Sequence, residues 1–383
     1  MKRFILILMI LPTALMARQS DPNLPMAQLG AAISERAIAA AAGVQQSAAL
    51  ETGEDSVIPP TFAPTTEGTP QQPSGQGSPP SSSPSTDRPK TNGSMVGYID
   101  NAIVGSQVIV RSEADIDDET PDLAEYLFAA CRCAYIPNAP GPTGLASTLN
   151  FEELRLYGEY AFNNRFSLFT EVPFRWVQPQ SFVPGLGSFM NQGGLSDINA
   201  GFKFAILASG RHYVSIKFLA SFPTGNASRG LGTNHYSVEP SVLYYQPLSR
   251  RLTLESEVGD WHPIGGSTGF SASGSGGFAG DVFFYGVGPS YEVYSGERVQ
   301  VAPVIELVGW QVLGGFQTVG PFLPGNPCAE SVCSAAGTSM LNLKAGARIT
   351  FGAHSSLYAG YGRALTDAYW YKRIFRLEYR YSF

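Results

Sequence analysis

The sequence predicts an all-β fold, a single transmembrane antiparallel β-barrel of about twelve strands preceded by a disordered N-terminal segment. Three observations predict it. Apolar and polar residues alternate through most of the chain after residue 98, and the connections between these stretches are in turn long and short. The 383 residues are also 44% hydrophobic but only 15% charged, with 42 Gly, 18 Tyr and 23 Phe, a composition that favours strands and turns over soluble helices.

The first residues, MKRFILILMILPTALMARQ, have two positive charges, an apolar run and small residues up to Ala17. This is the layout of a secretory signal peptide, which we place at residues 1–17. The apolar run is too short to span a bilayer as a helix. The first cysteine is Cys131, so no lipid attachment is expected near the cleavage site. Export by this leader agrees with a location in the cell outer membrane.

Residues 18–95 are predicted to be a periplasmic tail or linker. An Ala-rich stretch is followed by TPQQPSGQGSPPSSSPSTDRP, whose Pro, Ser, Gly and Gln residues cannot bury a core. Whether part of this tail enters the barrel as a plug stays open at this point.

The strand pattern occupies residues 98–383. An opening strand is expected near GSQVIVRSE (105–113). LRLYGEYAF (154–162) then alternates apolar and polar residues, NNR makes a tight turn, and FSLFTEVPFRW (166–176) repeats the alternation. The later stretches follow the same pattern, which predicts one face for lipid and one face for the lumen.

The connections distinguish a membrane barrel from a secreted β-sandwich, which would also alternate. Long connections such as QPQSFVPGLGSFMNQGG alternate with short ones such as ASGR, LSRR and SGER. Outer-membrane barrels have this arrangement, with short periplasmic turns and longer extracellular loops. An even number of strands also returns both termini to the periplasmic side.

The C-terminal stretch FRLEYRYSF has an apolar row and a charged row. The apolar row ends with Leu377, Tyr379, Tyr381 and Phe383. A last strand of this kind resembles the signal that bacterial barrel-assembly machinery recognises on its client proteins. The expected partners are therefore this machinery and outer-membrane lipid.

The middle of the chain resembles a known family. GGLSDINAGFKFAI (193–206) and SFPTGNASRGLGTNHYSVEPSVLYY (221–245) carry the resemblance to the putative MetA-pathway-of-phenol-degradation outer-membrane family, which is related to hydrophobic-compound transport barrels. The resemblance extends over about residues 150–383. It implies transport of small apolar or aromatic solutes, and it assigns a role to no individual residue.

The polar face of each predicted strand would line the lumen. The charged residues expected there are Arg155, Glu159, Glu171, Arg175, Asp197, Lys203, Lys217, Glu239, Glu255, Glu257, Glu306, Lys344, Arg348, Arg376, Glu378 and Arg380. The strands that contain residues 239–306 supply mainly acids, and those that contain residues 344–380 supply mainly bases, so the lumen has an acidic and a basic wall. These charges either steer polar solutes or pair across a narrow lumen as a structural network.

Catalysis, metals and other partners have little support. The sequence has neither a GxSxG nor an HExxH motif, and its four histidines are His212, His235, His262 and His354. His235 and His262, with Asp260 nearby, are the only candidates for acid/base chemistry. We predict no enzyme activity, no cofactor and no metal. The net charge of −6 without a basic cluster argues against nucleic acid.

Two further segments are expected in outer loops. The cysteines Cys131, Cys133, Cys328 and Cys333 are candidates for disulfides in the oxidising compartment, with the pairing left open. The acidic run EADIDDETPD (113–122) is expected to be a solvated loop, since its spacing does not match the EF-hand Ca²⁺ loop.

The function predicted from the sequence is therefore a passive, porin-like transporter or channel for small hydrophobic or aromatic compounds. The alternative is a structural or surface-interaction barrel with a closed lumen. A barrel hydrolase is a third, less favoured interpretation. The solute, the state of the lumen and the oligomeric state are not specified by the sequence.

Overall fold

The computed structural model describes residues 93–125, 127, 141–185, 187–209, 212–265, 277–318 and 332–383. The predicted signal peptide, almost all of the predicted tail, and Cys131, Cys133 and Cys328 lie outside these residues. Within them, no helix is long and apolar enough to cross a bilayer.

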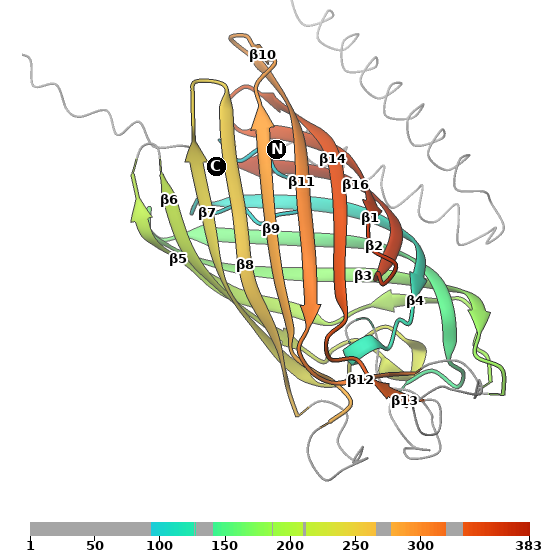
Figure 1. The fold of residues 1–383 in the computed structure, drawn as a ribbon. Helices are drawn as coiled ribbons and strands as arrows, with labels where there is room; N and C mark the ends of the chain where they lie inside the picture. Colours follow the sequence, from blue (N-terminus) through green and yellow to red (C-terminus); the bar gives the residue numbers. More distant parts are fainter. Residues whose placement is uncertain are drawn as a thin grey trace, which may run out of the picture. The chain divides into compact units, whose positions relative to one another are not determined.

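Twelve strands form a closed antiparallel barrel, and β16 pairs with β1 to close it (Figure 1). The prediction of an all-β antiparallel barrel is confirmed. The barrel strands in order are β1 (Gln107–Glu119), β2 (Ala146–Ala161), β3 (Phe166–Phe182), β5 (Ile198–Ala208), β6 (Tyr213–Phe222), β7 (Tyr236–Pro247), β8 (Leu252–Ile264), β9 (Val282–Tyr291), β11 (Val299–Val312), β14 (Ser339–Phe351), β15 (Ser355–Ala364) and β16 (Tyr371–Ser382).

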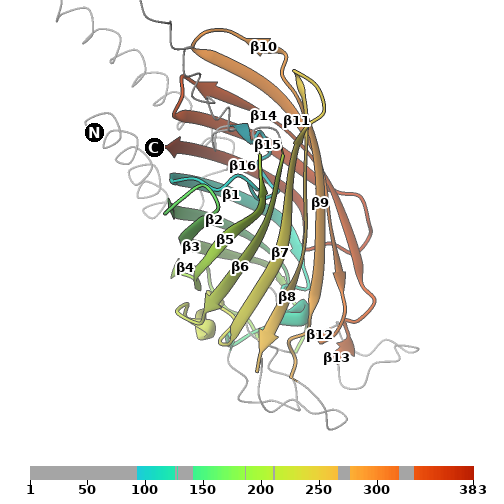
Figure 2. The same ribbon diagram turned by 90° about the vertical axis from the view of Figure 1, so that its left-hand side faces the viewer.

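The two ends of the barrel differ. At the short-turn end, tight connections join β2 to β3, β5 to β6, β7 to β8 and β14 to β15. Short additional elements gather at the opposite, long-loop end (Figures 1 and 2). They are β4 (Gln192–Leu195), β12 (Phe316–Thr318), β13 (Val332–Ser334) and the 3₁₀ turns η2 (Leu123–Glu125) and η3 (Ala227–Arg229). The two-residue strand β10 (Tyr294–Ser295) extends the hairpin of β11 at the short-turn end.

The outer surface of the barrel is apolar. Leu156, Leu168, Phe204, Ile216 and Leu377 are each between 36% and 46% exposed, and they lie on β2, β3, β5, β6 and β16. Charged neighbours of these residues in the sequence point inward, because successive side chains of a strand face opposite sides. An outward apolar band opposite a polar interior is the arrangement of barrels that span a bilayer.

β1 corrects one prediction. The acidic run was expected to be a solvated loop, but residues 113–119 belong to β1, which pairs with β2 and β16. Glu113, Asp115 and Asp118 are 6%, 1% and 2% exposed. Their alternation was the available signal, since Arg111, Glu113 and Asp115 continue the inward-facing row that begins with Gln107 and Ile109. The density of carboxylates hid a strand whose inner face is polar.

Candidate functional site

Residues 94–106, which we call the lumen segment, run inside the barrel before β1 begins. Both ends of the segment lie at the short-turn end, where the carbonyl of Ser94 accepts a hydrogen bond from Arg380 and the Ser106 hydroxyl accepts one from the N–H of Ala161. Its middle, residues 97–100, reaches the centre of the barrel beside Glu306. The segment therefore folds back on itself inside the lumen. Residues 94 and 95 were predicted to belong to the tail, but they are buried inside the barrel.

The acidic wall holds the N–H groups of the lumen segment. Glu255 accepts hydrogen bonds from the N–H groups of residues 95 and 96 at 2.9 and 3.4 Å. Glu306 accepts from residues 97–99 at 2.8–3.2 Å, and Glu257 accepts from residue 100 at 3.1 Å. Six consecutive N–H groups that no strand partner satisfies are thus satisfied by three carboxylates of β8 and β11.

The basic wall holds the carbonyl groups of the same segment. Arg348 donates to the carbonyls of residues 95 and 96 at 3.1 and 2.6 Å, and Arg376 donates to the carbonyl of residue 97. Lys203 donates to the carbonyl of residue 101 at 3.1 Å, from the other side of the barrel. The two walls therefore fit the two sides of one extended backbone.

Glu378 is the centre of the basic wall. Its carboxylate is fully buried and pairs with Arg348 at 2.8 Å, Arg111 at 3.0 Å and Arg380 at 3.2 Å. One carboxylate among three guanidinium groups leaves positive charge for the carbonyl oxygens of the lumen segment.

Two further groups of predicted residues pair on the opposite wall. Glu153, which is not among the predicted lumen charges, pairs with Arg155 and with Arg175, the latter at 2.7 Å. Arg155 also lies 3.5 Å from Glu171. Alternation places Glu153 on the same face as Arg155, and that signal was available in the sequence.

The remaining pairs involve two lysines. Lys203 pairs with Glu159 at 3.0 Å. Lys217 contacts Glu239 at 2.7 Å and Glu257 at 3.5 Å, and it also pairs with Asp100 of the lumen segment. Most of the predicted lumen charges are thus members of buried ion pairs that contact one another or the lumen segment.

Lys344 differs from the other basic residues. Its ammonium lies 4.1 Å from the ring centroid of Tyr98 and 5.4 Å from those of Trp310 and Tyr371. Within the described residues it has no carboxylate within ion-pair distance, and it is 3% exposed. Its charge is therefore balanced by aromatic faces rather than by an acid.

A cavity of about 290 Å³ occupies the long-loop half of the barrel. Its aromatic lining includes Phe151, Trp261, Phe284, Trp310 and Tyr371. The tip of the lumen segment, with Tyr98 and Asp100, forms its floor. A second space of about 40 Å³ lies beside residues 99–101, closer to the short-turn end. The interior is thus divided into a nearly filled half and a half with a cavity.

Asp197 holds the rim of this cavity together. Its carboxylate accepts hydrogen bonds from the N–H of Gly225 at 2.9 Å and from the N–H and hydroxyl of Thr233 at 2.8 and 3.0 Å. A Cβ at Gly232 would collide with the same carboxylate. Asp197 belongs to the first of the two stretches that carry the family resemblance, and Gly225, Gly232 and Thr233 belong to the second, so the two stretches form one interlocked loop structure.

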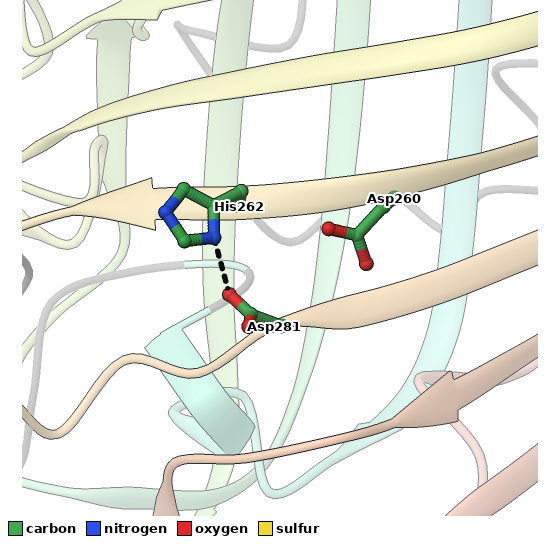
Figure 3. Close-up of side chains that lie close together, drawn as sticks. All are labelled: Asp260, His262 and Asp281. Atoms are coloured by element: carbon green, nitrogen blue, oxygen red, sulfur yellow. Dashed lines mark hydrogen bonds and ion pairs between the residues drawn. The ribbon is translucent and has the colours of Figure 1, made fainter.

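The histidine candidates lie at the same end of the barrel. His262 of β8 and Asp281, just before β9, form a hydrogen bond of 2.7 Å, and Asp260 lies beside them (Figure 3). These side chains face the opposite side of β8 from Trp261, which lines the cavity. His235 packs against Trp261 with ring centroids 5.8 Å apart, and burial lowers the pKa of His235. His262 thus has the carboxylate partner that acid/base chemistry needs, but the pair lies outside the cavity.

The disulfide prediction is not tested, because only Cys333, in β13, belongs to the described residues. The C-terminal strand has the expected faces: Phe375, Leu377 and Phe383 are 48%, 41% and 64% exposed, while Glu378 and Arg380 are buried. Recognition of this strand by assembly machinery stays a prediction.

Residues 138–259 match the model of the family described as putative MetA-pathway of phenol degradation. This match confirms the resemblance for residues 150–259 of the predicted 150–383. Among solved structures, an outer membrane channel from Pseudomonas putida F1 is 15% identical, with a TM-score of 0.45 and an alignment that covers 73% of this chain and 96% of that one. The β domain of the Bordetella autotransporter BrkA is also 15% identical, with a TM-score of 0.43 and coverage of 73% and 100%.

A FadL homologue from Pseudomonas aeruginosa is 11% identical, with a TM-score of 0.32 and coverage of 73% and 90%. No curated protein matches the sequence. The phenol-degradation family model overlaps β2–β8, and it includes Asp197 and the loop elements that Asp197 holds.

Proposed function

We propose that the protein is an outer-membrane β-barrel that passes or captures small hydrophobic or aromatic molecules without a cofactor. Solutes enter between the long loops and occupy the cavity. They then leave along the lumen, when the lumen segment moves, or sideways through the wall into the bilayer.

The cavity of about 290 Å³ carries this proposal. It lies at the long-loop end, it is lined by the rings of Trp261, Trp310 and Phe284, and its size suits a small solute. The description of the family matched by residues 138–259 names phenol degradation, which agrees with an aromatic solute.

The location in the outer membrane rests on three features of the chain. They are the predicted leader at residues 1–17, the apolar outer surface of the barrel, and the C-terminal strand that ends at Phe383. On this basis the protein's partners are outer-membrane lipid and the barrel-assembly machinery.

One observation favours the alternative of a closed structural barrel. Charged side chains hold both the N–H and the carbonyl groups of residues 94–101, and such a segment obstructs the lumen. In that case the long loops are the functional surface and no solute crosses.

Uptake by liposomes separates the two functions. The refolded full chain is expected to admit a small phenolic dye faster than empty liposomes do. Ser237→Trp should block this uptake, because Ser237 is buried in the cavity lining. The matched control is Ser295→Trp, at an exposed position of β10. Equal dye uptake with and without the protein would contradict transport and favour the closed barrel.

A further inference from the structure

Two carboxylates of β1 face the cavity without a partner. Asp115 and Asp118 are 1% and 2% exposed, and both line the cavity. Among the described residues, neither carboxylate oxygen of Asp115 has a hydrogen-bond partner. Oδ1 of Asp118 also has none. Asp117 between them adopts φ 55° and pairs outward with Arg373, and the pairing with β2 shifts register here. This irregularity turns Asp115 and Asp118 to the same inner face.

The paired residues of β2 beside these carboxylates are apolar, although charged side chains also line the cavity. Asp115 lies opposite Phe151 of β2, and Asp118 lies opposite Leu149, which is fully buried. An ionised carboxylate in such surroundings is strongly unfavourable unless a donor or a positive charge compensates it. A carboxylate without such compensation either takes up a proton or finds its partner in a ligand that enters the cavity.

The basic residues that face this region are engaged elsewhere. Arg376 of β16 pairs with Glu113, and Arg175 of β3 pairs with Glu153 and donates to the carbonyl of Leu127 at 2.9 Å. Lys344 of β14 lies over the rings of Tyr98, Trp310 and Tyr371. The protein's own cations therefore leave the carboxylate oxygens of Asp115 unpaired.

The aromatic lining is compatible with a positive charge. Trp310 and Tyr371 line the cavity and already surround the ammonium of Lys344 at 5.4 Å, so their faces tolerate a desolvated cation. The cavity of about 290 Å³ also leaves room for a ring, since an apolar cavity of roughly 150 Å³ holds benzene.

We propose that the cavity selects small aromatic or apolar molecules that carry a protonated amine, with Asp115 and Asp118 as the residues that bind the amine. This inference rests on the proposed function and names its solute class. The amine supplies a positive charge and several N–H donors to carboxylates whose buried oxygens have no hydrogen-bond partner among the described residues. The aromatic walls contact the ring of the solute.

The test compares three probes of similar size that differ in charge: 2-phenylethylamine, 2-phenylethanol and phenylacetate. Each is titrated into the refolded full chain in non-ionic detergent, and binding is followed by calorimetry and by tryptophan fluorescence, since Trp261 and Trp310 line the cavity. The amine is expected to bind at least about tenfold more tightly than the alcohol, because a charge-assisted hydrogen bond to a buried carboxylate is strong. Phenylacetate should bind most weakly.

Asp115→Asn and Asp118→Asn remove the negative charge with almost no change in volume. Each is expected to weaken amine binding about tenfold and to leave binding of the alcohol within about twofold. Asp117→Asn is the matched control, because it makes the same chemical change between the two positions on a side chain that is 37% exposed. It should bind all three probes as the unaltered protein does.

The outcomes separate this inference from the proposed function. If the alcohol binds as tightly as the amine, or if amine binding is unchanged in both variants, the amine preference is wrong while an aromatic-binding cavity remains. If no probe binds to the folded protein, the proposed solute class fails as well. Should the variants fail to fold, the comparison of the three probes on the unaltered chain decides the question.

Discussion

The two halves of the barrel interior contain similar charged side chains that have different roles. In the short-turn half, Glu255, Glu378 and Arg348 are fully buried, and each is bonded to a partner or to the lumen segment. In the long-loop half, Asp115 and Asp118 are equally buried but face a cavity with unpaired oxygens. A buried charge by itself therefore indicates little about function. The presence or absence of its partner distinguishes a structural position from a binding position.

The largest expected effect comes from Glu378 in the filled half. Replacing it by alanine leaves Arg111, Arg348 and Arg380 as buried charges without their common partner. Loss of one member of a buried pair costs about 3–5 kcal/mol of unfolding free energy. Urea unfolding in detergent micelles measures this loss, with the exposed Glu297→Ala as the control. A loss below about 1 kcal/mol would mean that this half is not held by its ion pairs.

Asp197 should give the next largest effect, at the boundary between the cavity and the loops. Asp197→Ala removes the acceptor for Gly225 and Thr233, and each hydrogen bond to a charged group is worth about 1.5–3 kcal/mol. We expect the loop of residues 223–235 to open before the barrel does, so limited proteolysis should cut it first. Asp197→Asn keeps one acceptor oxygen, so its loop should be cut more slowly than that of Asp197→Ala and faster than that of the unaltered chain.

Glu306→Gln tests whether the filled half is a fixed wall or a gate. The substitution keeps the size of a side chain that accepts hydrogen bonds from residues 97–99 and from the Tyr358 hydroxyl, but it removes the charge that favours all four. Loss of charge assistance should destabilise the lumen segment by about 1–2 kcal/mol. Single-channel conductance in planar bilayers should then increase in size or frequency. Conductance equal to that of the unaltered chain would indicate that the segment does not limit passage.

Alternation and loop length predicted the barrel, because one face of each strand meets lipid and the other the interior. The same alternation places residues such as Arg155 and Glu378 inside. It does not specify which charges would meet across the barrel, since Glu378 reaches Arg111 on β1 only through closure of the wall and Arg348 on β14 across the intervening β15. The lumen segment could not be predicted, because its residues show no regular alternation of apolar and polar side chains. Side chains of distant strands determine its conformation.

The cavity was equally hidden in the sequence. Asp115 and Asp118 belong to a run whose charge density is typical of a loop, and only the pairing of β1 with β2 and β16 shows that they are buried. The rings that line the cavity come from β2, β8, β9, β11 and β16, and their convergence is a property of the closed barrel. The sequence identified the elements of the site but not the absence of partners that makes it a site.

Lys344→Met tests the border between the two halves. The substitution keeps a flexible chain of similar length and removes the ammonium that lies over Tyr98, Trp310 and Tyr371. A desolvated cation–π contact is worth about 2 kcal/mol. Its loss is partly offset because the buried charge no longer requires compensation. We therefore expect a net loss of about 1 kcal/mol in unfolding free energy. Amine probes should bind more tightly, because a like charge has left the cavity. Weaker amine binding would contradict a repulsive role for Lys344.

The smallest effect is expected on the outside of the wall, where an ion pair has the same chemistry as those inside. Arg373 and Asp117 lie 2.9 Å apart, but their side chains are 46% and 37% exposed. Such pairs contribute about 0–1 kcal/mol, because solvent and salt screen the charges and ordering two long side chains costs entropy. Arg373→Gln should therefore change the unfolding free energy by less than about 1 kcal/mol and leave conductance and probe binding unaltered. The ratio of this effect to that of Glu378→Ala measures how much of the barrel's stability depends on burial of the ion pairs rather than on their number. A ratio near one would mean that exposed and interior pairs contribute equally, and burial of the ion pairs would then not explain the stability of the short-turn half.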